Sequence, residues 1–144
     1  ISQTLWSSIG YSVGALLGAC IADPTRQALL FVGDGSFQLT AQEISTIMRH
    51  NLTPLIFLIN NDGYTIERYV HAPEMKYQEI KRWNYSELPK VFGENCISLK
   101  ITTEEQLSQV VEQYFQARER TMYFVEVVMG KMDGPAVMKK FFKI

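Results

Sequence analysis

The sequence is poor in the residues that build zinc sites and disulfide frameworks. It contains two cysteines and two histidines in 144 residues. Cys20 and Cys96 are far apart and lie in apolar neighbourhoods, so we expect reduced core thiols rather than a disulfide or a metal-binding pair. Cysteine used in this way is typical of a reducing compartment, and we expect a cytoplasmic protein.

An excess of positive charge and long apolar runs are also missing. The 14 Lys and Arg residues against 15 Asp and Glu residues give a formal net charge of -1, without the basic excess typical of nucleic-acid binders. The longest apolar run, residues 54–59, has the length of a strand rather than the roughly 18 residues of a membrane span. The first residues lack the charged start and apolar stretch of a signal peptide.

What is present fits one globular domain. The chain is long enough to bury a core, 47% of its residues are apolar, and no internal repeat or low-complexity tract divides it. Because the chain opens abruptly and without Met, we expect residues 1–144 to be one domain, cut from a longer chain.

The apolar pattern predicts strands that alternate with helices. Short, continuously apolar runs predict buried strands, and residues 37–50 have helical spacing with Leu39, Ile44, Ile47 and Met48 on the buried side. The expected strands are residues 28–32, 55–59, 97–101 and 122–129. The expected helices are residues 8–22, 37–50, 135–142 and one capped by Thr102 or Thr103 that runs to about Arg120, with short helices or a loop over residues 64–85. This order indicates an α/β domain, a doubly wound parallel sheet with helices on both faces.

The first expected helix is unusually rich in small residues. Glycine inside a helix costs stability, so it usually marks a face where another backbone comes close. We therefore expect another backbone to come close to this helix. The small residues are Gly10, Gly14, Ala15, Gly18, Ala19 and Ala22.

Two polar motifs follow the first two expected strands. Residues 33–36 read Gly-Asp-Gly-Ser, and residues 60–63 read Asn-Asn-Asp-Gly. In parallel sheets, ligands bind outside the carboxyl ends of the strands, and glycines there let the backbone approach a phosphate. Asp34, Asn61 and a backbone carbonyl near Gly63 supply oxygen ligands of the kind that Mg²⁺ prefers. Each motif alone also reads as an ordinary turn; together, at this spacing, they favour a binding site.

The two motifs and their spacing resemble the signature of thiamine-diphosphate-dependent enzymes. The resemblance implies that Asp34, the Asn61 side chain and the Gly63 carbonyl hold Mg²⁺, which anchors the diphosphate. It implies that Gly35 and Ser36 contact the diphosphate through their amides.

The residues after Asn61 resemble the 2-keto-acid decarboxylase group, which includes pyruvate, indolepyruvate, phenylpyruvate and branched-chain keto-acid decarboxylases. Residues 61–67 read Asn-Asp-Gly-Tyr-Thr-Ile-Glu, and the resemblance continues through residues 69–73, 83–85 and 5–10. It implies that Glu67 takes part in proton transfers as a 2-oxo acid loses CO₂ and an aldehyde is released. A solvated Glu67 paired with Arg68 is the alternative.

The resemblance also assigns roles to other residues. The Ser7 carbonyl, where relatives usually carry glycine, receives the amino group of the cofactor's aminopyrimidine, and Ile9 supports the bent cofactor. Ile66 and Val70 line the substrate pocket, and the small Val70 favours indolepyruvate, phenylpyruvate or branched-chain acids over pyruvate. The residues expected to bind the cofactor are Ser7, Ser8, Ile9, Gly33, Asp34, Gly35, Ser36, Asn61, Gly63, Tyr64, Thr65 and Ile66.

Such enzymes complete the site with a pyrimidine-binding domain of a neighbouring subunit. The resemblance therefore implies a homodimer or homotetramer and an isolated chain that binds cofactor weakly and is inactive. A carboligase of the acetohydroxyacid synthase type is the alternative enzyme, although Glu67 argues against it. A non-catalytic thiamine module and a flavodoxin-like phosphate-binding domain are less favoured. We expect His50 at a helix end and leave a role for His71 near the site open.

Overall fold

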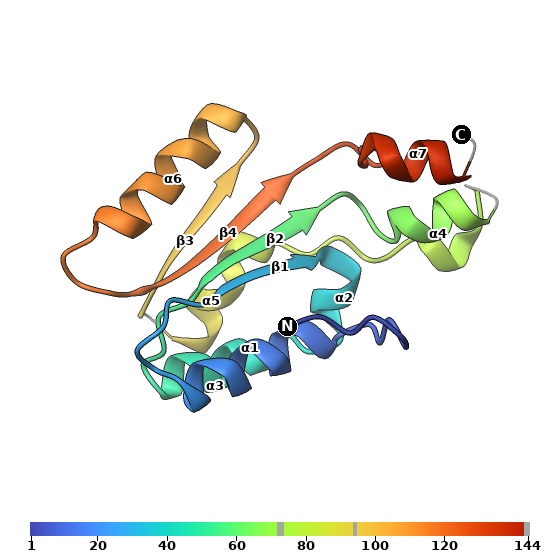
Figure 1. Cartoon of the computed structure of the whole chain (residues 1–144). Coiled ribbons are helices and arrows are strands. Elements are labelled where there is room, and N and C mark those ends of the chain that lie inside the picture. The colour runs from blue at the N-terminus through green and yellow to red at the C-terminus, as the bar shows by residue number, and fades with distance from the viewer. Residues whose placement is uncertain (72–73, 94, 143–144) are drawn as a thin grey trace.

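The computed structural model describes residues 1–71, 74–93 and 95–142, and its centre is a four-stranded parallel sheet (Figure 1). The strand order is β1-β2-β4-β3. The strands are β1 (Leu29–Gly33), β2 (Leu55–Asn60), β3 (Cys96–Ile101) and β4 (Met122–Val128). Each expected strand is confirmed with its ends displaced by at most one residue.

Helices precede, connect and follow these strands. None of the helices formed by the described residues has the length and apolarity that a bilayer crossing requires. The α-helices are α1 (Tyr11–Ala22), α2 (Asp34–Gln38), α3 (Glu43–Arg49), α4 (Thr65–Val70), α5 (Leu88–Phe92), α6 (Glu104–Gln116) and α7 (Ala136–Phe142). Helices α2, α4 and α7 lie beyond the carboxyl ends of the strands (Figure 1). Two short 3₁₀ helices, η1 (Lys76–Gln78) and η2 (Tyr85–Glu87), lie in the long connection to β3.

The unbroken apolar sequence of β2 arises because both of its faces are buried. Successive side chains of a strand point to opposite faces. Ile56 and Leu58 therefore join the core beneath α1 and α3, and Leu55 and Phe57 join a second core beneath α6. The expected parallel sheet with helices on both faces is confirmed for this central strand.

The outer strand β1 is covered on one face only. Leu30 and Val32 are buried, whereas Leu29 and Phe31 on the other face are exposed, Phe31 to 68%. The Phe31 ring stacks on Phe57 with 5.0 Å between ring centroids. Helix α6 lies over the far side of the sheet, so the second layer ends before β1 (Figure 1).

The expected helix over residues 37–50 is wrong as a single element. Helix α2 ends at Gln38, α3 begins at Glu43, and Leu39 is 57% exposed rather than buried. In the break, the Thr40 hydroxyl donates a hydrogen bond of 2.8 Å to the Gly10 carbonyl. The chain therefore turns here to meet the segment that precedes α1.

Two other helix boundaries differ from expectation. Helix α1 begins at Tyr11 rather than residue 8, because Gly10 has a φ of 90°, which is not helical. Helix α6 ends at Gln116 rather than about Arg120. Its expected cap is confirmed, since Thr103 Oγ1 accepts a hydrogen bond from the Gln106 amide at 3.2 Å.

Candidate functional site

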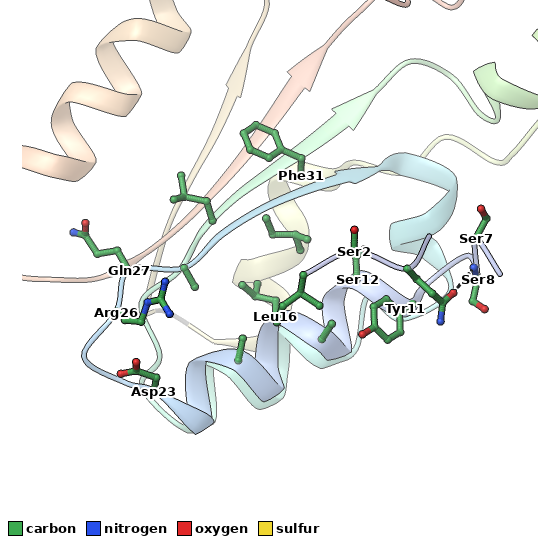
Figure 2. Close-up of a pocket in the computed structure, with 17 residues that line it drawn as sticks. Ser2, Ser7, Ser8, Tyr11, Ser12, Leu16, Asp23, Arg26, Gln27 and Phe31 are labelled. Atoms are coloured by element: carbon green, nitrogen blue, oxygen red, sulfur yellow. Dashed lines mark hydrogen bonds between the residues drawn. The ribbon is translucent and has the colours of Figure 1, made fainter. Parts of the chain in front are cut away.

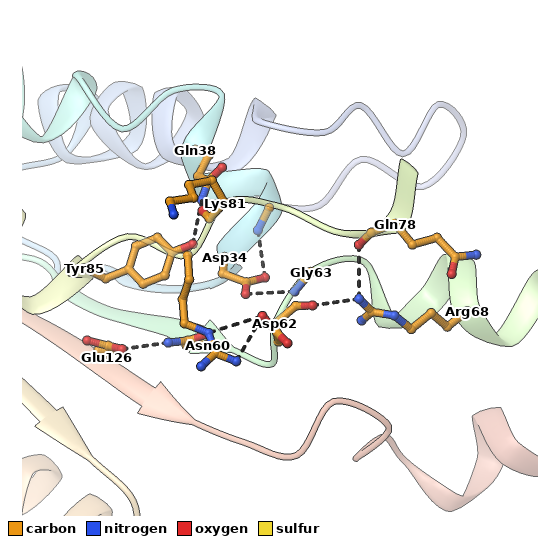
Figure 3. A network of polar contacts seen from close by, with 12 residues as sticks. Asp34, Gln38, Asn60, Asp62, Gly63, Arg68, Gln78, Lys81, Tyr85 and Glu126 are labelled. Atoms are coloured by element: carbon orange, nitrogen blue, oxygen red, sulfur yellow. Dashed lines mark hydrogen bonds and ion pairs between the residues drawn. The ribbon is translucent and has the colours of Figure 1, made fainter. Parts of the chain in front are cut away.

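The two polar motifs meet at the carboxyl ends of β1 and β2. Asp34, the first residue of α2, is fully buried. Its Oδ1 accepts a hydrogen bond from the Gly35 amide at 2.8 Å, and its Oδ2 accepts one from the Gly63 amide at 3.0 Å (Figure 3). The Asp34 carboxylate therefore joins two motifs that helix α3 and strand β2 separate in the sequence.

The turn that follows β2 requires glycine at its end. Asp62 has a φ of 64° and Gly63 a φ of 109°. A Cβ atom on Gly63 would lie 2.3 Å from the Gln78 carbonyl oxygen. Glycine is required at this position both by its conformation and by the space available.

Gly35 is restricted by a different neighbour. A Cβ atom there would lie 2.5 Å from the Tyr64 ring, and the Tyr64 hydroxyl donates a 3.4 Å hydrogen bond to the Gly35 carbonyl. Tyr64, which caps α4, thus packs directly on the first motif. The close contact between the two motifs depends on the absence of a side chain at Gly35.

Burial raises the pKa of the Asp34 carboxyl above its ordinary value of 3.8, and the charge of Asp62 raises it further. Backbone N–H groups of Gly63, Gly35 and Asp62 oppose this shift. Among the described residues, no Lys, Arg or His forms an ion pair with Asp34. A bound cation would supply the missing opposite charge, since a buried ion is costly unless it is paired.

The donor atoms at this edge suit a hard divalent cation. The described residues contain no group of three His, Cys, Asp or Glu side chains that could hold a metal ion. A cation at Asp34 would therefore be completed by amide and main-chain oxygens, which Asn61 and Gly63 in the adjoining turn carry. Such all-oxygen sets bind Mg²⁺ together with substrate phosphates.

The segment before α1 also reaches this edge of the sheet. The Gly10 amide donates a hydrogen bond of 2.9 Å to Ser36 Oγ, which ties residues 7–10 to the first motif. Ser8 and Ile9 are exposed beside it. Ser7 has a φ of 45°, a conformation that glycine adopts more easily than serine.

Helix α4 presents Glu67 next to the turn. Glu67 Oε2 lies 3.5 Å from His71 Nε2, and the Glu67 side chain is 37% exposed. Ile66 and Val70, four residues apart, are exposed on the same helix. Thr65 is buried and its hydroxyl donates to the Lys131 carbonyl at 2.8 Å, which fixes the start of the helix.

The alternative pairing of Glu67 with Arg68 is wrong. Arg68 points into the protein, where its Nη2 donates to the Asp62 carbonyl at 2.7 Å and the Gln78 carbonyl at 3.2 Å. His71 instead lies beside Glu67, and His50 is the expected helix-end residue, at the C-terminus of α3. Residues 72 and 73, part of the family resemblance, lie outside the described residues.

A buried network beneath the turn was not expected from the sequence. The Asn60 side chain donates to Glu126 Oε1 at 2.7 Å (Figure 3). The Ser86 amide donates to Glu126 Oε2 at 3.2 Å. Lys100 Nζ lies 3.2 Å from Glu126 Oε1. A single glutamate inside the apolar run 122–129 is the signal that would have identified it, because a buried charge needs partners.

A groove of about 510 Å³ lies beside this site rather than over it. It runs between α1, the first residues of the chain and β1, and Ser7, Tyr11, Leu16 and Phe31 line it (Figure 2). The groove reaches the site at Ser7 and Ser8, but Asp34 and Glu67 do not line it.

The two free cysteines, Cys20 and Cys96, lie buried and half-buried respectively, as expected.

Comparison with known proteins gives consistent matches. A family model described as the C-terminal TPP-binding domain of thiamine pyrophosphate enzymes matches residues 1–127. A pyruvate decarboxylase of Aspergillus fumigatus is 45% identical over 144 residues, which cover 96% of this chain and 25% of the relative. A putative pyruvate decarboxylase of Schizosaccharomyces pombe is 48% identical over 151 residues, covering 96% of this chain and 26% of the relative.

An alpha-keto-acid decarboxylase of Mycobacterium tuberculosis is 41% identical over 139 residues, covering 96% of this chain and 25% of the relative. The chain thus spans about a quarter of the length of the curated relatives that it matches.

Proposed function

Because the chain belongs to the family of C-terminal TPP-binding domains of thiamine pyrophosphate enzymes, we propose that it is the diphosphate- and Mg²⁺-binding domain of a longer 2-keto-acid decarboxylase. The proposed reaction is the non-oxidative conversion of a 2-oxo acid to an aldehyde and CO₂. The observation that carries the proposal is the hydrogen bond between Asp34 and the Gly63 amide, which brings the two motifs together. Gly63 is followed directly by Tyr64, the N-cap residue of α4, and that helix carries Glu67.

The metal role fits the residues that meet at the edge of the sheet. In the proposed site, Asp34, the Asn61 side chain and the Gly63 carbonyl hold Mg²⁺, which neutralises the buried Asp34 carboxylate and the diphosphate together. The Gly35 amide already donates to Asp34. The Ser36 amide, in the first turn of α2, has no acceptor within the helix and is the better donor to a diphosphate oxygen.

The remaining residues orient the cofactor and handle protons. When bound, thiamine diphosphate supplies the electron sink that allows CO₂ to leave. The Ser7 carbonyl and the exposed Ile9 side chain would hold the aminopyrimidine end of the cofactor, on a segment that Ser36 fixes through the Gly10 amide. Glu67 would transfer the proton that aldehyde release requires, and His71 Nε2 lies 3.5 Å from its Oε2.

We propose a bulky substrate, that is indolepyruvate, phenylpyruvate or a branched-chain acid. Ile66 and Val70 are both exposed and lie on the side of α4 that carries no cover within this chain. Valine leaves more room than isoleucine or leucine, and one methylene in an apolar pocket changes specificity by about 1–3 kcal/mol.

The missing parts of the site are assigned to the rest of the parent enzyme. We propose that a pyrimidine-binding domain of a neighbouring subunit completes the site, in a homodimer or homotetramer. The share of the relatives that this chain covers, about a quarter, supports a parent with further domains. The free thiols support a reducing, cytoplasmic location.

The test uses the full-length parent with thiamine diphosphate and Mg²⁺. Aldehyde release is measured from pyruvate, 3-methyl-2-oxobutanoate, phenylpyruvate and indolepyruvate, with Glu67→Gln and, as a matched control, the exposed Glu79→Gln. The proposal expects aldehyde from the bulky acids, a loss of at least about 100-fold in Glu67→Gln, and little change in the control. A longer hydroxyketone as the main product would favour the carboligase instead.

A further inference from the structure

Arg68 is the largest fully buried side chain of the described residues and carries a charge. It is 1% exposed, although its neighbours on α4, Ile66 and Val70, face outwards. Its Nη2 donates to two main-chain carbonyls, those of Asp62 and Gln78. In the described part of the chain, its Nε and Nη1 have no hydrogen-bond partner. A buried guanidinium held only by carbonyls is costly, so a residue that merely filled this space would be apolar.

The peptide unit between Asp62 and Gly63 is held at both ends. Its carbonyl accepts the 2.7 Å hydrogen bond from Arg68, and its N–H donates the 3.0 Å hydrogen bond to Asp34 (Figure 3). Hydrogen bonds in such a chain polarise one another, and those to a charged group are the strong ones. The guanidinium thus acts on the Asp34 carboxylate through one peptide plane.

Arg68 also joins the turn to the segment 76–78. The Gln78 carbonyl accepts from both Arg68 and the Tyr64 amide, the latter at 3.2 Å. A Cβ atom on Gly63 would lie 3.0 Å from Arg68 Nη2, so the guanidinium packs directly against this glycine. The Asp62–Gly63 peptide is therefore held by two side chains, Asp34 at its N–H and Arg68 at its carbonyl oxygen.

We propose that Arg68 is a positioning residue for the cation and diphosphate, because it fixes the Asp62–Gly63 peptide, which donates its N–H to Asp34 and directly precedes the Gly63 carbonyl. This rests on the proposed function of that site. Arg68 touches neither cofactor nor substrate. It acts by holding the oxygen atoms of Asp34 and Gly63 in one arrangement.

A second arginine on the same turn provides a matched control. Arg82 Nη2 and Nε lie 3.1 Å and 3.2 Å from Asp62 Oδ1, but this side chain is 67% exposed. Arg82 therefore contacts the Asp62 side chain from solvent, whereas Arg68 holds the main chain from inside. If net charge near the turn were all that mattered, the two arginines would be equivalent.

The experiment titrates Mg²⁺ into the full-length parent at fixed thiamine diphosphate, for wild type, Arg68→Met, Arg68→Lys and Arg82→Met. Loss of a charged hydrogen bond predicts Mg²⁺ binding about 10- to 100-fold weaker in Arg68→Met, with Arg68→Lys between it and wild type. Arg82→Met stays within about threefold of wild type. KM for thiamine diphosphate rises in Arg68→Met, while kcat for aldehyde release, measured at saturating cofactor, changes little.

Chemical rescue separates positioning from general folding. Methylguanidine added to Arg68→Ala restores Mg²⁺ affinity at least severalfold, and it changes nothing in Arg82→Met. Unchanged or tighter Mg²⁺ binding in Arg68→Met overturns the proposal. If Arg68→Met does not fold, wild-type affinity in Arg68→Lys overturns it, because an ammonium group does not reproduce the guanidinium fork. A wild-type parent that binds no Mg²⁺ and thiamine diphosphate refutes the proposed function itself.

Discussion

Replacement of Gly63 by alanine is expected to destabilise the chain strongly. A non-glycine residue held at a φ of 109° costs about 1–3 kcal/mol. The new Cβ would lie 2.3 Å from the Gln78 carbonyl oxygen, so that carbonyl must move away. Its hydrogen bonds from Tyr64 and Arg68 would then be lost, at about 0.5–1.5 kcal/mol for the neutral donor and about 1.5–3 kcal/mol for the charged one.

The expected loss is about 3–7 kcal/mol, which approaches the whole stability of a small domain. The assay is urea unfolding of residues 1–144, followed by circular dichroism, with Gly130→Ala as the control. A Cβ on Gly130 meets nothing closer than 3.5 Å, so that variant changes the free energy of unfolding by less than about 0.5 kcal/mol. A loss below about 1 kcal/mol in Gly63→Ala would refute the reasoning.

Three further predictions concern the core and the helix ends. Burial raises the pKa of Tyr85 to about 12, so stability of up to about 3 kcal/mol, complete below pH 10, is lost as pH rises towards 12. Urea unfolding between pH 9 and 12 should show a smaller loss in Tyr85→Phe than in wild type; the loss that remains in the variant is assigned to Cys96 and Tyr114, whose pKa values burial also raises. Thr103→Ala removes the cap of α6 and lowers the unfolding free energy by about 1 kcal/mol, with no effect expected from Thr25→Ala on that helix. Burial raises the pKa of Cys96 to about 12, so iodoacetamide at pH 8 should label it slowly until denaturant is added; fast native labelling would count against a buried thiol.

The strands and the meeting of the two motifs could be predicted from the sequence. A continuous apolar run such as 55–59 has few solutions other than a strand buried on both faces, and parallel strands bring their carboxyl ends to one edge. The positions of Asp34 and Gly63 follow from that rule alone. Their direct hydrogen bond does not, because it depends on the φ of 109° at Gly63.

Other features depend on long-range contacts that spacing does not encode. The helical pattern of residues 37–50 is real, but the Thr40 bond to Gly10 interrupts it and exposes Leu39. From the sequence, Arg68 is expected on the surface beside Glu67. In the structure it is buried, and its guanidinium donates to the carbonyls of Asp62 and Gln78. Local propensity is a weak prior that tertiary contacts override.

The uncovered face of β1 has a similar origin. A short apolar run predicts a buried strand, yet Leu29 and Phe31 are exposed in this chain. The sequence records burial in the protein as a whole, whereas the fold of residues 1–144 supplies cover on one face of this strand only. The apolar pattern therefore predicted the strand β1 correctly, but it did not predict that one face of β1 is uncovered in residues 1–144.

Cofactor binding by the full-length parent tests the central claim most directly. Thiamine diphosphate is titrated calorimetrically into wild type and Asp34→Asn, each with Mg²⁺ and with EDTA. The account predicts heat of binding for wild type only when Mg²⁺ is present, and affinity at least about 100-fold weaker in Asp34→Asn. Equal affinity in the two proteins, or binding that is indifferent to EDTA, would contradict a site built on Asp34.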